Sequence, residues 1–91
     1  MNDPRLDKIR DRLLAHLGPA EIALEDESAL HAGHAGAASG GGHYRLRITS
    51  AKFAGLNLVT RHRLVYDAVQ GMMHTDIHAL AITAHAPSEL S

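Results

Sequence analysis

The 91 residues of this chain are enough for one small domain, which we expect to span residues 1–91. Hydrophobic residues make up 45% and charged residues 21% of the chain, which is ordinary for a folded protein and argues against disorder. Cysteine is absent and the net charge is −1, which excludes disulfides and thiol catalysis and does not indicate a strong nucleic-acid binder.

No apolar run approaches the ~18 to 20 residues that a membrane-spanning helix needs. The first residues also lack the basic-then-apolar order of a secretory signal. We therefore expect a cytoplasmic protein that has no membrane partner.

The first predicted element is an amphipathic helix. Asp3 and Pro4 are typical of a helix start, and Gly18 followed by Pro19 is typical of a helix end. Between these signals one face carries apolar residues at helical spacing: Leu6, Ile9, Leu13, Leu14 and Leu17.

Two strands are predicted next, over residues 20–27 and 43–50, because apolar and polar residues alternate in both. In the second strand Tyr44, Leu46 and Ile48 form the apolar side. Arg45 and Arg47 face away from it, where they can pair across the sheet with Glu25 or Glu27.

The stretch 28–42 between these strands holds five of the eight glycines together with His31 and His34. It has no hydrophobic periodicity, so we expect a loop. Loops of about 15 residues in small domains usually carry function or are mobile.

A second helix is predicted from the N-cap residue Asn57 to Met73. Arg61 and Arg63 flank its apolar face and are expected to reach solvent through their long stems. That face is expected to hold Leu58, Val59, Val65, Tyr66, Val69, Met72 and Met73, with His62 in its middle.

Residues 77–85 are predicted to form a last strand, with His78 on the same side as Leu80, Ile82 and Ala84. A long connection through a helix favours a right-handed crossover, which makes this strand parallel to the second one. The order α-β-β-α-β, with both helices on one face of a three-stranded mixed sheet, predicts an α+β fold.

The sequence contains no enzyme signature. It lacks the phosphate-binding loop, the dinucleotide-binding glycine pattern, the H-E-x-x-H zinc motif and the G-x-S-x-G serine motif. We therefore do not expect an enzyme, and the run Glu25-Asp26-Glu27 is interpreted as a solvated strand end.

Eight histidines carry the remaining chemical signal. His31 and His34 are candidate metal ligands because a glycine-rich loop can bring imidazole to an ion without distorting the core. His78, at the start of the last strand, is ambiguous by itself. The others are interpreted as solvated, locally bonded or structural side chains: His16, His43, His62, His74 and His85.

Four motifs in order resemble the BolA family over nearly the whole chain. They are Leu24-x-Asp26-Glu27-Ser28-x-x-His31, then His43-Tyr44-x-Leu46-x-Ile48-x-Ser50, then Phe53-x-Gly55 with Arg61-His62-Arg63-x-Val65-Tyr66, and Ile77-His78-Ala79-Leu80-Ala81-Ile82 before Pro87. The resemblance implies a fold like a class II KH domain. It also implies a monothiol glutaredoxin as partner, with a [2Fe-2S] cluster shared between the two proteins in iron homeostasis.

In that family the histidine that opens the last strand, here His78, is the usual cluster ligand, and a second ligand comes from the loop between the first two strands. His31 matches that place, and His34 is the alternate. The partner's cysteine and glutathione would supply the thiolates that this chain lacks.

The family name also carries a second interpretation, a DNA-binding transcriptional regulator. The residues for it are Lys52, Arg61, Arg63, Arg45 and Arg47. The net charge of −1 and an aromatic content of 3% argue against it, because neither a dense basic patch nor stacking residues are evident.

Overall fold

The computed structural model describes residues 4–28, 42–73 and 75–90. The elements in chain order are α1 (Pro4–Leu17), β1 (Glu21–Asp26), β2 (Gly42–Thr49), η3 (Ala51–Phe53), α2 (Leu58–Ala68), β3 (Ile77–His85) and η4 (Pro87–Leu90). No helix among the described residues is long and apolar enough to cross a membrane.

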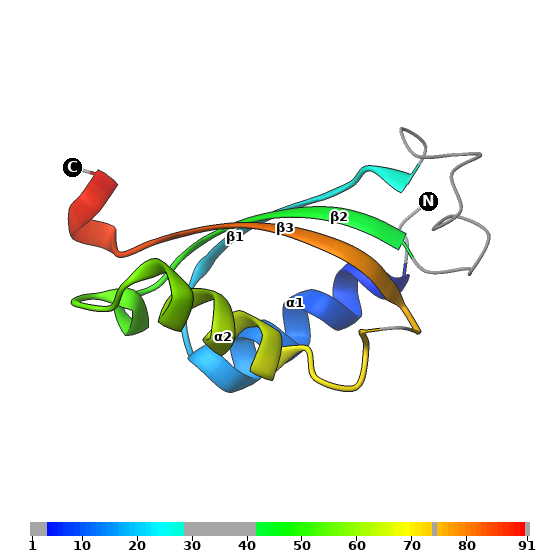
Figure 1. Cartoon of the computed structure of the whole chain (residues 1–91), viewed down its shortest axis with the longest axis horizontal. Coiled ribbons are helices and arrows are strands. Elements are labelled where there is room, and N and C mark those ends of the chain that lie inside the picture. Colours follow the sequence, from blue (N-terminus) through cyan, green and yellow to red (C-terminus); the bar gives the residue numbers. More distant parts are fainter. Residues whose placement is uncertain (1–3, 29–41, 74, 91) are drawn as a thin grey trace.

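The three strands form one sheet in the order β1-β2-β3. β1 pairs with β2 antiparallel, and β2 pairs with β3 parallel. Figure 1 shows α1 and α2 together on one face of this sheet, and the face that these two helices do not cover is called the open face below. The predicted α+β architecture and the parallel last strand are confirmed.

Helix α1 begins and ends where the sequence predicts. Gly18 takes a φ of 76°, a left-handed conformation that glycine adopts without steric cost. Its N–H donates to the carbonyl of Leu14 at 3.0 Å and so closes the last turn. Ile9, Leu13 and Leu17 are buried against the sheet, whereas Leu14 is 38% exposed.

Helix α2 begins as predicted but ends earlier. The side chain of Asn57 accepts a hydrogen bond from the N–H of Thr60 at 2.9 Å. The helix stops at Ala68 instead of continuing to Met73. Gly71 has a φ of 93°, so the chain turns there, and the N–H of Ile77 then donates to the carbonyl of Met72 at 2.9 Å.

The buried face of α2 differs from the predicted one. Leu58 and Val59 are 64% and 60% exposed, and Tyr66 is 41% exposed. Arg61 is buried instead, so the expectation that it reaches solvent is wrong. The spacing of apolar residues predicts the wrong buried face for α2, because it does not show that the guanidinium of Arg61 has hydrogen-bond partners in the interior.

Those partners of Arg61 lie at the end of the sheet. Its guanidinium donates to the carbonyl of Leu56 at 2.9 Å, to the carbonyl of Ala84 at 3.1 Å, and to both carboxylate oxygens of Glu89 at 2.7 and 2.6 Å. A bidentate pair of this kind fixes orientation as well as distance. Arg61 therefore ties η4 to α2 and β3.

The core lies between the sheet and the helices. The predicted apolar side of β2 is confirmed, since Tyr44, Leu46 and Ile48 are each at most 2% exposed. Ile22 and Leu24 of β1 pack against this core from its rim. Among the described elements, α1 and α2 thus cover the same face of the sheet and leave the side chains of its opposite face uncovered by either helix.

Candidate functional site

Two histidines meet where β2 and β3 begin. Because these strands are parallel, their first residues lie at the same end of the sheet. The imidazole rings of His43 and His78 are 5.0 Å apart between centroids, with 49° between their planes. His78 is exposed and His43 is half-buried.

An irregularity in the pairing of β2 with β3 sets the direction of His78. Gly42 pairs with Ile77, but His43 pairs with Ala79, so His78 has no residue opposite it in β2. Such a bulge changes which face the following side chains occupy. Ile77 and Leu80 are both buried, whereas His78 is exposed beside His43. The prediction that His78 shares the side of Leu80 is therefore wrong.

Backbone hydrogen bonds hold this corner of the sheet. The N–H of His43 donates to Oγ of Ser28 at 3.1 Å, and its carbonyl accepts from the N–H of Glu27 at 2.7 Å. The N–H of Gly42 donates to the carbonyl of Asp76 at 3.1 Å. The segment between Ser28 and Gly42 therefore leaves and re-enters the described structure beside His43 and His78.

The predicted loop ligands His31 and His34 lie outside the described residues. Their backbone attachment at Ser28 is within reach of the site, because Ser28 itself contacts His43. Whether His31 or His34 is a ligand thus stays a prediction.

Charged groups around the two histidines are paired with one another. Nε of Arg45 lies 2.9 Å from a carboxylate oxygen of Glu27, and this hydrogen bond raises the pKa of Arg45 above its usual value. Nζ of Lys8 lies 2.8 Å from a carboxylate oxygen of Asp76. The predicted cross-strand pairing is confirmed for Arg45 with Glu27. Arg47 stands opposite Ala23 and forms no ion pair among the described residues.

The chemistry that this corner offers is imidazole coordination. In residues 4–28, 42–73 and 75–90 no group of three or more histidine, cysteine, aspartate or glutamate side chains could hold a metal ion. Two imidazoles leave coordination positions open, and a group bound here needs further ligands from elsewhere. A cluster with thiolates from a second protein meets that condition.

Sequence reasoning missed His43, which it treated as solvated or locally bonded. The outward direction of His43 follows from the alternation along β2, and that part is confirmed. Its proximity to His78 depends on the parallel pairing and on the bulge, and the bulge leaves no local signal. The BolA-like motifs contain His43 and His78 separately and do not indicate that the two rings are neighbours.

The basic residues of the DNA-binding alternative do not share one surface. Arg45 and Arg47 project from the open face of the sheet, while Arg63 is exposed on α2, which covers the opposite face. The guanidinium of Arg61 is buried and bound to Glu89, so it is not available to a phosphate. The described structure gives no support to this alternative.

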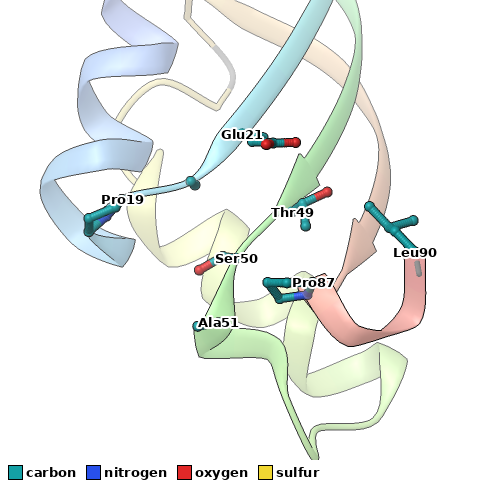
Figure 2. A pocket seen from close by; sticks show the side chains of 8 residues that line it. Pro19, Glu21, Thr49, Ser50, Ala51, Pro87 and Leu90 are labelled. Carbon is teal, nitrogen blue, oxygen red and sulfur yellow. The ribbon is translucent and has the colours of Figure 1, made fainter.

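A groove of about 610 Å³ lies at the other end of the sheet (Figure 2). Its walls are Pro19, Ala20, Glu21, Thr49, Ser50, Ala51, Pro87 and Leu90. Glu21 is the only ionisable side chain among them, so the groove has no convergent chemistry. It is remote from His43 and His78, since Thr49 lies six positions after His43 along β2, about 20 Å at ~3.3 Å per residue.

Comparisons with known proteins place this arrangement in a family. The profile described as BolA-like protein matches residues 13–89. SufE-like protein 1, chloroplastic/mitochondrial, of Arabidopsis thaliana is 43% identical over 88 residues, which cover 91% of this chain and 24% of that protein. Protein BOLA1, chloroplastic, of the same plant is 42% identical, covering 93% of this chain and 55% of that protein.

The chain therefore spans about a quarter of the length of the first relative and about half of the length of the second. Neither relative has the name of an enzyme. The solved BolA domain of SufE1 from Arabidopsis thaliana superimposes with a TM-score of 0.83 and 42% identity, covering 98% of this chain and 99% of that domain. Sequence and fold agree, and the chain belongs to the BolA-like protein family.

Proposed function

We propose that this protein is a non-enzymatic partner of a monothiol glutaredoxin and shares a [2Fe-2S] cluster with it in iron homeostasis. His78 is the ligand in β3, and the second imidazole comes from the segment between β1 and β2, His31 first and His34 as the alternate. The observation that carries this proposal is the placement of His78, exposed at the end of the sheet where that segment is attached.

The donor set fits such a cluster. The chain contains no cysteine, so it cannot hold a thiolate-ligated cluster alone, and glutaredoxin cysteine and glutathione would provide the thiolates. A shared cluster supplies one-electron chemistry and a transferable iron-sulfur unit. The contribution of this chain is a pair of neutral ligands, which raise the reduction potential relative to an all-thiolate site.

The surroundings of His78 support this role in two ways. The bulge places its imidazole on the open face of the sheet, where a partner can approach without displacing α1 or α2. The neighbouring carboxylates of Glu27 and Asp76 are held by Arg45 and Lys8. These two carboxylates are therefore already engaged by cations of the chain.

A glutaredoxin titration tests the proposal. The purified chain is expected to be colourless and to change the visible spectrum of cluster-loaded monothiol glutaredoxin when it is added, forming a 1:1 complex. His78→Ala should abolish that change. His16→Ala is the matched control, because His16 is exposed on α1 away from the site.

Circular dichroism of both variants checks that the fold is intact. An unaltered spectrum on mixing with the wild-type chain, or an undiminished change with His78→Ala, would contradict the proposal.

A further inference from the structure

The spacing of His43 and His78 matches that of two imidazoles bound to one ion. A Zn²⁺–N bond is about 2.0–2.1 Å, and the ring centroid lies about 1.1 Å beyond the nitrogen, so two rings on a tetrahedral ion have centroids ~5.1 Å apart. The observed centroid separation is 5.0 Å. The rings are also tilted by 49° and not stacked, so the contact is not a parallel π-stack.

We propose that His43 and His78 form a metal site of their own, which binds a divalent transition-metal ion of the Cu²⁺ and Zn²⁺ class in the isolated protein. This site needs neither a partner nor the residues between Ser28 and Gly42. Its remaining coordination positions belong to water or to a group that a partner presents.

The backbone fixes both ligands before an ion arrives. His43 has its N–H and its carbonyl engaged by Ser28 and Glu27. His78 stands on the bulge between two buried residues, Ile77 and Leu80. Binding therefore requires little ordering of the main chain, which favours affinity.

The donor type selects the ion. Imidazole suits Zn²⁺, Cu²⁺ and Ni²⁺, whereas Mg²⁺ and Ca²⁺ require oxygen ligands. The two carboxylates anchored at this corner, Glu27 and Asp76, are engaged by cations of the chain. Affinity should therefore follow the order Cu²⁺ above Zn²⁺, with no measurable binding of Mg²⁺.

The site has a consequence for the proposed function. His78 would serve both the single ion and the shared cluster, so an ion on the pair should block cluster sharing. That consequence rests on the proposed function, but binding of the ion by the isolated chain does not.

A Cu²⁺ titration of the purified protein, without iron and without glutaredoxin, tests the site. Calorimetry is expected to give one ion per chain, and electron paramagnetic resonance is expected to show nitrogen couplings from two imidazoles. His43→Ala and His78→Ala should each weaken binding by 10-fold or more. The double variant His31→Ala/His34→Ala should bind like wild type.

Unchanged affinity in His43→Ala, or loss of binding in the His31→Ala/His34→Ala variant, would overturn the proposal. Nuclear magnetic resonance on the wild-type protein tests the site without requiring that any variant folds. Zn²⁺ should shift the ring signals of His43 and His78, and unshifted signals for either residue would also overturn the proposed metal site. Failure of the glutaredoxin titration leaves all of these results unaffected, so the two proposals fail separately.

Discussion

Replacing Gly42 by alanine tests how the corner that carries the histidines is packed. Gly42 and Tyr44 are both on the buried side of β2, and the ring of Tyr44 lies back over Gly42. A Cβ on Gly42 would come within 2.5 Å of the Cε2 and Cζ atoms of Tyr44, closer than real Cβ atoms approach. Because Tyr44 is 2% exposed, its ring has no free space into which to move.

The magnitude follows from two opposing effects. Overpacking of this kind costs about 1–3 kcal/mol. Alanine restricts the unfolded chain and fits a strand better than glycine, which recovers about 0.5–1 kcal/mol. Gly42→Ala should therefore lower the free energy of unfolding by about 1–2 kcal/mol, which corresponds to a Tm about 4–15 °C lower for a domain of this size.

Urea denaturation with a double-mutant cycle isolates the cause. Leucine at position 44 lacks the far end of the ring, so adding Gly42→Ala to Tyr44→Leu should be neutral or stabilising, and the two changes should couple by about 2 kcal/mol. A Gly42→Ala protein that is as stable as the wild-type protein would contradict the close packing of Tyr44 on Gly42. A loss of stability that persists unchanged in the Tyr44→Leu background would contradict it as well.

Three further predictions concern α2 and η4. Val65→Ala should cost about 2 kcal/mol in urea denaturation because Val65 is fully buried, whereas Val59→Ala on the 60% exposed side should cost under about 0.5 kcal/mol; equal costs would contradict the observed face of α2. Asn57→Ala should cost about 1 kcal/mol because the N–H of Thr60 loses its acceptor, and Asn57→Asp should retain stability; no loss in Asn57→Ala would show that the cap is unimportant. The hydrogen bond from Arg61 lowers the pKa of Glu89 from 4.5 to about 2, so the stability that this carboxylate contributes is fully present above about pH 4.5 and is lost as the pH falls towards 2. Glu89→Gln should therefore be less stable than wild type at neutral pH, with a difference that shrinks in acid, and a difference independent of pH would refute the ion pair's role.

Local patterns were enough to predict most of the fold. Short-range preferences of the backbone explain the residues Pro4 and Gly18 at the ends of α1 and the alternation along β1 and β2. The elements that these patterns predict are present in the structure. The parallel placement of β3 followed from the handedness of crossovers. These rules act within a few residues or on topology, so they do not require knowledge of individual contacts.

The failures in α2 come from long-range contacts. The helix turned its Arg61 side inwards because Leu56, Ala84 and Glu89 satisfy the guanidinium, and two of these partners lie 23 and 28 residues away in the chain. A prediction from hydrophobicity alone wrongly placed Leu58 and Val59 on the buried face of α2. Four hydrogen bonds compensate the burial of this guanidinium, so Arg61 is buried while Leu58 and Val59 stay exposed.

The candidate site could be predicted only through resemblance. His78 was identified in that way and not through its spacing; the structure shows that its side chain is exposed, and its role as a ligand stays a prediction. The loop ligands are not tested by the described residues. The contact between His43 and His78 could be recognised only from the structure, because it depends on the bulge between the pairs Gly42–Ile77 and His43–Ala79.

The proposed function requires that an imidazole of this chain binds the iron of a cluster shared with glutaredoxin. Pulsed electron paramagnetic resonance of the reduced complex, prepared with the chain labelled by ¹⁵N-histidine, detects that bond. Nitrogen couplings are expected that change with the isotope and that lose the contribution of one imidazole in His78→Ala. A reduced cluster without histidine nitrogen coupling, or with couplings identical in His78→Ala, would contradict it.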